Sequence, residues 1–397
     1  MLSNFFNNKS FTEKYDVSFS YRKTREYEEG FKNRVNNSQI NILPLNLLNI
    51  KNLYDLFSRC PIWIQKLIKV IINLFMIRCF FVFYNTIVLY KIFKKKGIKV
   101  LHINNGGYPG AYSCMSAVFA AKLAHINNIV YVVNNIAVPY DNISRKLDYC
   151  FDKLVSQYVT LFVTGSLYAG NQLMKVLRIA ESKVVNIHNG IGYRPITEDK
   201  AVVLKRLGIG TNKLLVGIVA IHEQRKGHLY LFEAIKKLKE KYGKKTPLLV
   251  VEGCGPLTPS LIGFVKGNNL EKDIVFVGNE KKVFNFMNAM DVIVLPSISN
   301  EDFPNVVLEA MSLGKIIVAS KIAGIPEQID NMKNGIIVEP RNVDDLVESL
   351  GKIIENIDTY KKLGLNAKDK FNDNFTDNVA VNRYDLLYKY ILEGGNA

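Results

Sequence analysis

Two carboxylates and two neighbouring cations in the second half of the chain are the residues best suited to chemistry. Glu301 follows an apolar run in a polar loop, and Glu309 lies eight positions later within an apolar pattern of helical spacing. Pro304 suits the start of that helix, where free backbone N–H groups favour an anion. Arg225 and Lys226 follow another apolar run. The two glutamates could bind two ends of one phosphorylated ligand, although glutamates alone are more typical of a solvated loop and a surface helix.

Strand and helix patterns alternate regularly after residue 213, which is typical of a parallel sheet covered on both faces. We expect strands at 214–220, 248–252, 274–277, 292–295, 316–319 and 336–338. Helices should begin near His228, Pro256, Lys282, Pro304, Pro326 and Val343. Ligands bind at the carboxyl ends of such strands, where Gly253, Gly255 and Gly278 would join the charged residues. Cations and helix N-termini suit a diphosphate, and a carboxylate suits the hydroxyls of a ribose. The pattern therefore predicts a nucleoside-diphosphate site.

Several of these segments resemble the family 4 glycosyltransferases, which are retaining enzymes of the GT-B fold. The resemblance covers roughly residues 214–340 and rests on Arg225-Lys-Gly227, Gly253-Cys-Gly-Pro256, Asp291 to Ser297, Glu301 to Ala310, Gly324-Ile-Pro-Glu327 and Asn334-Gly335. It implies an α/β protein with two doubly wound, Rossmann-like domains that face each other across a cleft.

The resemblance also implies roles for the matched residues. Glu309 would hold the nucleotide ribose, and Glu301 would face the transferring sugar. Lys226, with Arg225, would neutralise the leaving diphosphate. Backbone groups of a short segment would complete the donor site, namely those of Phe303, Pro304, Asn305 and Val306. The chain contains no D-x-D pair, so neither a metal nor another cofactor is indicated.

The first half resembles the acceptor domain of this family more loosely. We expect strands at 15–22, 98–103, 129–133, 158–164 and 184–187 and a helix at 113–125. Gly106 and Gly107 follow one strand and would let a ligand approach the backbone. Asn134 follows another, where many members carry a histidine; an amide can bind sugar but cannot shuttle a proton. The family opens with a strand and a glycine-rich loop that this chain lacks, so either its start is truncated or the Gly106–Gly107 loop assumes part of that duty.

The most apolar and basic region covers residues 64–96. Its longest uncharged run, 79–90, has 12 residues, whereas a membrane-spanning helix needs about 20. Two interpretations stay open for it. The region could pack on the sheet of the first domain, or it could lie on a membrane as an interfacial helix. In the second case the cations that meet anionic headgroups would be Lys66, Lys69, Arg78, Lys91 and Lys94.

Composition narrows the class of partner. The chain has 397 residues, 48% of them hydrophobic, and a formal charge of +16, which suggests an anionic partner. Nucleic acid is not favoured, because no arginine-rich tract, zinc-finger spacing or aromatic RNA-binding strand occurs. The five cysteines are scattered and unpaired in spacing, and the N-terminus has no apolar signal segment, so we expect a cytoplasmic protein with reduced thiols.

We expect an acceptor domain at 1–192, a linker at 193–213, a nucleotide-sugar domain at 214–375 and a C-terminal helix at 376–397 that crosses back to the first domain. The predicted function is retaining transfer of a hexosyl-type group from a nucleotide diphosphate sugar to a lipid-linked saccharide acceptor. The predicted place is the inner face of the cytoplasmic membrane, on an anionic surface, in polysaccharide or lipopolysaccharide assembly. Two alternatives are a catalytically silent GT-B subunit that binds a nucleotide sugar, and a nucleotide-sugar epimerase.

Overall fold

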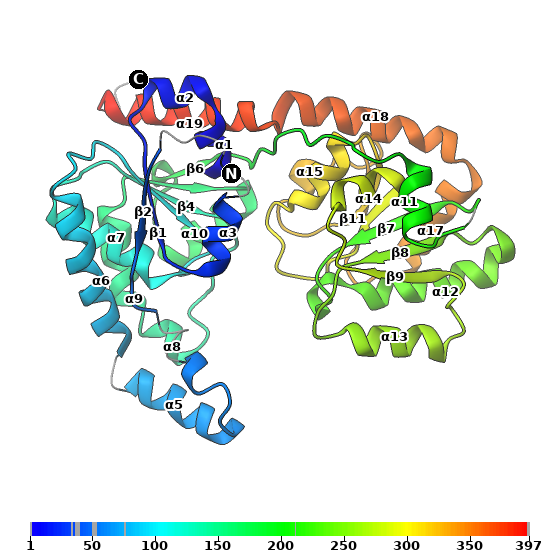
Figure 1. The fold of residues 1–397 in the computed structure, drawn as a ribbon, viewed down its shortest axis with the longest axis horizontal. Coiled ribbons are helices and arrows are strands. Elements are labelled where there is room, and N and C mark those ends of the chain that lie inside the picture. The colour runs from blue at the N-terminus through cyan, green and yellow to red at the C-terminus, as the bar shows by residue number, and fades with distance from the viewer. Residues whose placement is uncertain are drawn as a thin grey trace. The chain divides into compact units, whose positions relative to one another are not determined.

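The computed structural model describes residues 2–32, 35, 40–49, 54–74, 77–210 and 212–394. The chain divides into two compact units (Figure 1). The first combines Met1–Ile187 with Val381–Ala397, and the second is His188–Ala380. Each unit contains a parallel sheet with helices against it, which confirms the predicted α/β class.

The second unit is built on a six-stranded sheet in the order β12-β11-β10-β7-β8-β9, with every pair parallel. Its strands are β7 (Leu215–Val219), β8 (Leu248–Glu252), β9 (Ile274–Gly278), β10 (Val292–Leu295), β11 (Ile316–Ser320) and β12 (Ile336–Val338). Long apolar runs form these strands because helices cover both faces of the sheet. Three strands coincide with their predicted bounds, and the ends of the other three differ by at most one residue.

Helices cover the two faces of this sheet through two separate apolar cores. One face carries α11 (Lys200–Arg206), α14 (Val283–Ala289), α15 (Asn305–Ser312), α16 (Ile325–Gln328) and α18 (Ile357–Asn374). The other carries α12 (His228–Tyr242), α13 (Thr258–Gly267) and α17 (Val343–Glu355). The predicted helix starts lie within two residues of the observed ones. No helix was predicted at the position of α18.

The first unit contains a four-stranded parallel sheet in the order β3-β4-β5-β6. Its strands are β3 (Leu101–Asn105), β4 (Ile129–Val133), β5 (Leu161–Thr164) and β6 (Val184–Asn186). A separate pair, β1 (Ser18–Arg22) and β2 (Asn41–Leu45), forms a two-stranded parallel sheet.

Three predicted strands in this unit begin three residues too early. The strand expected at 15–22 begins at Ser18. The strand expected at 98–103 begins only at Leu101 and continues through Asn104 and Asn105, which the prediction placed in the loop. The strand expected at 158–164 begins at Leu161, because Tyr158 is the last residue of the helix α9 (Tyr149–Tyr158). Aromatic and β-branched residues at a helix end gave this stretch the apolar look of a strand.

Helices from both ends of the chain cover the four-stranded sheet. One face carries α6 (Ile77–Phe93), α7 (Tyr112–Leu123), α9 and α10 (Leu167–Leu177). The other carries α1 (Leu2–Asn7), α2 (Lys9–Lys14) and the C-terminal helix α19 (Asp377–Leu392). Thr376 caps α19 as predicted, since its hydroxyl oxygen accepts a hydrogen bond from the N–H of Val379 at 3.3 Å. The remaining helices of this unit are α3 (Arg25–Lys32), α5 (Ile62–Leu74) and α8 (Ile143–Lys146).

The apolar region predicted at 64–96 forms two helices with different surroundings; positions 75 and 76 lie outside the described residues. The inner face of α6 packs against α7, with Leu89 and Phe93 in the core. By contrast, α5 extends away from the body of the unit (Figure 1) and exposes its apolar side chains, Trp63 by 66%. Within the described residues, no helix is long and apolar enough to cross a membrane.

The expectation that Arg78 faces lipid headgroups is wrong. Its side chain lies inside the first unit, with 1% of the residue exposed. Its guanidinium pairs with Asp148, 3.1 Å away. A buried guanidinium needs such a partner, and the partner lies too far along the chain for the sequence pattern to reveal it. The side chains of Lys66, Lys91 and Lys94 are exposed, and that of Lys69 is not among those described.

Candidate active site

The loop after β10 brings the predicted carboxylate Glu301 to the predicted cations. Glu301 is buried, with 6% exposed, and forms an ion pair with the ammonium of Lys226. Its Oε1 also accepts a hydrogen bond from the hydroxyl of Ser297 at 2.8 Å. Arg225 lies at the edge of this group, with its Nη1 3.6 Å from the same Oε1. These residues therefore form one charged cluster at the carboxyl end of two central strands.

The backbone holds the two loops of this cluster together. The N–H of Ile298 donates to the carbonyl of Arg225 at 2.7 Å. Gly227 follows the short 3₁₀ turn that carries both cations and has a φ of +70°. A Cβ at Gly227 would lie 1.9 Å from the carbonyl oxygen of Pro296, so only glycine fits this crossing. The guanidinium of Arg225 is fixed further by Nε, which donates to Glu223 at 2.7 Å.

Glu309 lies on α15 and is paired with a different cation. The Nη1 of Arg194, in the segment before α11, is 3.1 Å from Oε1 of Glu309. Burial raises the pKa of Glu309, and the charge of Arg194 opposes that shift. Arg194 was not among the predicted site residues. Its sequence signal was weak, because it is one of several cations in a polar connecting segment.

The start of α15 presents the predicted donor-binding segment. Pro304 occupies the N-cap position with an extended backbone, and the helix begins at Asn305. No side chain caps this end of α15, so the amides of Asn305 and Val306 lie at an uncapped helix N-terminus. Pro304 thus precedes the first helical turn instead of lying within it.

Phe303, directly before Pro304, is buried and stacks on a histidine that the prediction missed. The ring of His188 stacks on that of Phe303 with 4.7 Å between centroids and an 8° interplanar angle. The Nε2 of His188 lies 3.1 Å from Oε2 of Glu327. His188 therefore joins the segments of Phe303 and Glu327, both of which belong to the family resemblance. The sequence signal that could have identified His188 was its place before Asn189-Gly190 in a segment that also resembles the family.

The predicted donor-side glycines lie on neighbouring strand ends. The N–H of Gly253 donates to the carbonyl of Gly278 at 2.8 Å. Gly253 has a φ of +118°, and a Cβ there would lie 2.2 Å from the carbonyl oxygen of Ala220. A Cβ at Gly255 would lie 2.7 Å from the carbonyl oxygen of His222. The strand ends of β7, β8 and β9 are therefore in direct backbone contact.

The predicted acceptor-side residues lie together at the ends of β3 and β4 in the first unit. The amide Nδ2 of Asn134 donates to Oδ1 of Asn104 at 3.0 Å and to the carbonyl of Asn105 at 2.8 Å. Gly107 lies beside Asn135, whereas Gly106 has open space where a side chain would be. The amide of Asn134 thus ties the two strand ends together.

Comparison with known proteins identifies the kind of enzyme. Residues 199–370 match the family model described as "Glycosyl transferases group 1". The chain is 26% identical over 314 residues to the Escherichia coli UDP-Gal:alpha-D-GlcNAc-diphosphoundecaprenol alpha-1,3-galactosyltransferase, covering 76% of this chain and 77% of that protein. It is 29% identical over 247 residues to the Campylobacter jejuni N,N'-diacetylbacillosaminyl-diphospho-undecaprenol alpha-1,3-N-acetylgalactosaminyltransferase, covering 61% and 62% of the two chains. The protein is a glycosyltransferase of the GT-B fold.

A solved structure agrees with the fold of this glycosyltransferase. A Rickettsia africae glycosyltransferase superposes with a TM-score of 0.76 at 18% identity, covering 99% of this chain and 95% of that one. The predicted architecture of two Rossmann-like domains is thereby confirmed. The comparisons favour neither the silent subunit nor the epimerase.

Proposed function

We propose that this glycosyltransferase moves a sugar, with retention of configuration, from a nucleotide diphosphate sugar to a lipid-linked saccharide acceptor. The observation that carries the proposal is the cluster of Glu301, Lys226 and Arg225 beside the uncapped start of α15. The galactosyltransferase of E. coli, which uses a UDP sugar and a diphosphoundecaprenol-linked acceptor by name, makes UDP sugars the first donors to test.

In this proposal, the second unit binds the donor. Glu309 accepts hydrogen bonds from the ribose hydroxyls, and the amides at the start of α15 bind the diphosphate or the sugar. A diphosphate beside Lys226 competes with Glu301 for the ammonium, which frees the carboxylate to face the sugar. When the bond between the sugar and the diphosphate breaks, charge grows on the leaving oxygen, and Lys226 and Arg225 stabilise it.

The first unit binds the acceptor at the loops after β3 and β4, which carry Gly106, Gly107 and Asn134. Asn134 orients the acceptor instead of taking its proton, because an amide has no basic site at neutral pH. The proposed mechanism uses no metal ion, since Lys226 and Arg225 supply the positive charge that a leaving diphosphate requires.

The proposed location is the inner face of the cytoplasmic membrane, where a lipid-linked acceptor would lie. Ten lysines and arginines and not one aspartate or glutamate occur between Leu56 and Tyr140. The outer face of α6 exposes Phe80 and Phe83, and α5 exposes Trp63 and Leu67. Apolar side chains among an excess of cations match an anionic lipid surface. Assembly of a cell-surface polysaccharide, such as lipopolysaccharide, follows from such an acceptor.

The decisive experiment incubates the wild-type enzyme and Glu309→Ala with UDP sugars, with and without a diphosphoundecaprenol-linked sugar. We expect acceptor-dependent UDP release by the wild type, an axial-to-axial or equatorial-to-equatorial anomeric outcome by NMR, and little release by the variant. Conversion of donor alone would favour an epimerase, and binding without release would favour a silent subunit. Release that is unaffected by Glu309→Ala would refute the assigned donor site.

Membrane binding has its own test. The protein should float with vesicles that contain phosphatidylglycerol and remain behind with purely phosphatidylcholine vesicles. The double variant Trp63→Ser, Leu67→Ser should reduce flotation, because both side chains are exposed. Equal flotation with both kinds of vesicle, or flotation unchanged by the double variant, would contradict the proposed surface.

A further inference from the structure

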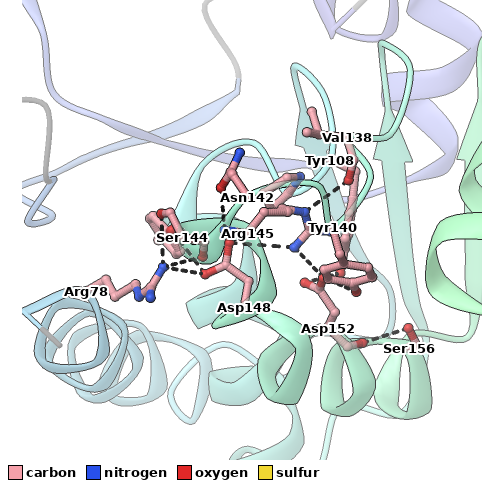
Figure 2. Close-up of polar contacts among 12 residues, drawn as sticks. Arg78, Tyr108, Val138, Tyr140, Asn142, Ser144, Arg145, Asp148, Asp152 and Ser156 are labelled. Atoms are coloured by element: carbon pink, nitrogen blue, oxygen red, sulfur yellow. Dashed lines mark hydrogen bonds and ion pairs between the residues drawn. The ribbon is translucent and has the colours of Figure 1, made fainter. Parts of the chain in front are cut away.

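Four charged side chains form a buried cluster in the first unit, apart from the predicted site residues (Figure 2). Arg78 comes from α6, Arg145 from α8, Asp148 from the turn after it and Asp152 from α9. Their exposed fractions are 1%, 4%, 2% and 1%. We name these residues the buried ionic cluster.

Alternating charges connect α6 to α9 through this cluster. The Nη1 of Arg78 lies 3.1 Å from Oδ1 of Asp148 and donates to the carbonyl of Ser144 at 2.7 Å. The Nη1 of Arg145 lies 3.6 Å from Oδ2 of Asp148 and 2.5 Å from Oδ2 of Asp152. Burial raises the pKa of both aspartates, and the arginines oppose that shift. Two positive and two negative groups therefore balance one another.

Two tyrosines connect the cluster to the loops of the proposed acceptor site. The hydroxyl of Tyr108, directly after Gly106 and Gly107, donates to Oδ1 of Asp152 at 3.1 Å. The hydroxyl of Tyr140, in the segment after β4, donates to Oδ2 of the same carboxylate at 2.6 Å. The guanidinium of Arg145 lies over the ring of Tyr140, 4.3 Å from its centroid.

Backbone contacts complete the connection. The N–H of Val138 donates to the carbonyl of Tyr108 at 2.8 Å, which joins the loop after β3 to the loop after β4. The carbonyl of Val138 accepts in turn from Nε of Arg145 at 3.0 Å. Both loops are therefore held by Arg145 and Asp152 (Figure 2). Asp152 accepts from their tyrosine side chains, and Arg145 donates to the backbone of Val138.

Such a cluster adds little net stability, because removing four charges from water offsets most of their mutual attraction. Its ion pairs and hydrogen bonds, by contrast, determine where the side chains that contact it lie. We propose that Arg145 and Asp152 are positioning residues, which act through Tyr108 and Tyr140 to fix the two acceptor-side loops relative to α6. The inference rests on the proposed function, since it takes these loops to bind the lipid-linked acceptor.

The test compares two variants, each of which removes one tyrosine hydroxyl that donates to an aspartate of the buried ionic cluster. Tyr108→Phe removes the donor to Asp152 from the acceptor loop. Tyr112→Phe is the matched control, because the Tyr112 hydroxyl donates to Asp148 at 3.2 Å from α7 and not from either loop. We expect Tyr108→Phe to raise the KM for the lipid-linked acceptor about fivefold or more, with the KM for the donor unchanged. Tyr112→Phe should leave both constants within about twofold of wild type.

Hydrogen exchange of the full-length variants provides a readout that does not depend on activity. Tyr108→Phe should speed exchange at residues 106–111 and 136–140, and Tyr112→Phe should not. Equal acceptor KM values and equal loop exchange in the two variants would overturn the inference. If the wild type transfers no sugar with any donor, the proposed function fails, and faster loop exchange in Tyr108→Phe alone would still support the positioning of these loops by the cluster.

Discussion

The guanidinium of Arg194 lies 3.1 Å from the carboxylate of Glu309, so the proposed ribose anchor is paired with a cation from the segment before α11. More than half of the Arg194 side chain is exposed, whereas the Glu309 side chain is largely buried. Burial raises the pKa of Glu309, and the charge of Arg194 opposes this shift by favouring the ionised carboxylate.

Replacement of Glu309 should weaken donor binding. The variant Glu309→Ala loses the carboxylate proposed to accept from two hydroxyls, and hydrogen bonds to a charged group contribute about 1.5–3 kcal/mol. We expect the Kd for the nucleotide sugar, measured by calorimetry, to rise at least about tenfold. Glu348→Ala, on the exposed face of α17, is the control and should bind as wild type does. Equal affinities in both variants would place the ribose elsewhere.

Donor affinity should also depend on pH through Glu309. Because burial raises its pKa, the carboxylate takes up a proton at a higher pH than an ordinary glutamate, and affinity should fall as the pH is lowered towards that range. Arg194→Ala removes the opposing charge, so the fall should begin at a still higher pH. Glu309→Gln should bind more weakly and lack this pH dependence. Parallel profiles for wild type and Glu309→Gln would show that another group titrates.

Lys226 should affect turnover more than any exposed lysine. Loss of one charge that stabilises a leaving oxyanion lowers kcat by about 10²–10³-fold, which we expect for Lys226→Met. Lys237→Met is a suitable control, because Lys237 forms an exposed ion pair with Asp344 on the same unit. Lys226→Met leaves the buried Glu301 without this partner. Thermal unfolding of both variants therefore checks that each remains folded at the assay temperature. A kcat within about threefold of wild type would remove Lys226 from the mechanism.

Gly253 should be intolerant of a side chain, whereas Gly263 should accept one. Gly253→Ala places a Cβ 2.2 Å from a carbonyl oxygen at a residue with positive φ. We therefore expect the free energy of unfolding to fall by about 2 kcal/mol or more. Gly263 lies inside α13, and a Cβ added there would meet nothing within 4 Å. Gly263→Ala should therefore be neutral or stabilise by about 0.5–1 kcal/mol. Urea unfolding of both variants measures the difference, and equal midpoints would contradict it.

Asp385 on α19 should stabilise the first unit only above acidic pH. Burial alone would raise its pKa, but hydrogen bonds from Lys14, Tyr15 and Lys389 outweigh that and lower it to about 2. A lowered pKa contributes stability that is present above the ordinary value of 3.8 and is lost as the pH falls towards 2. The contribution is on the order of 2 kcal/mol. In acid-unfolding curves, wild type and Asp385→Asn should differ above about pH 4 and converge near about pH 2.

The sequence was sufficient where one local signal decides the outcome. Fully buried parallel strands such as β8 and β10 are continuous apolar runs bounded by glycine, proline or acidic residues, so their limits could be predicted. The helix α18 was missed although Leu363, Ala367 and Phe371 recur at helical spacing, because polar and charged residues make up most of the segment around them. Glu301 and Lys226 could be predicted to meet because both follow strands of one parallel sheet.

Pairs that depend on tertiary packing could not be predicted. Arg78 reads as an exposed cation in an apolar helix, but Asp148, 70 positions later, lies beside it in the fold. Arg194 likewise gains its meaning only from Glu309, and His188 only from Phe303 and Glu327. In each case the sequence shows a polar residue of unremarkable type, and the partner that defines its role is distant along the chain.

The C-terminal helix has a consequence for how the protein is made. Side chains of α19, including Val381, Tyr384 and Tyr388, complete the core that α1, α2 and one face of the four-stranded sheet begin. A ribosome releases this helix only after the whole second unit has been synthesised. The second unit can therefore close its core during translation, while the first unit waits for α19. Only a chain translated through α19 would complete both units, so synthesis interrupted before α19 would yield a folded second unit beside an unfinished first unit.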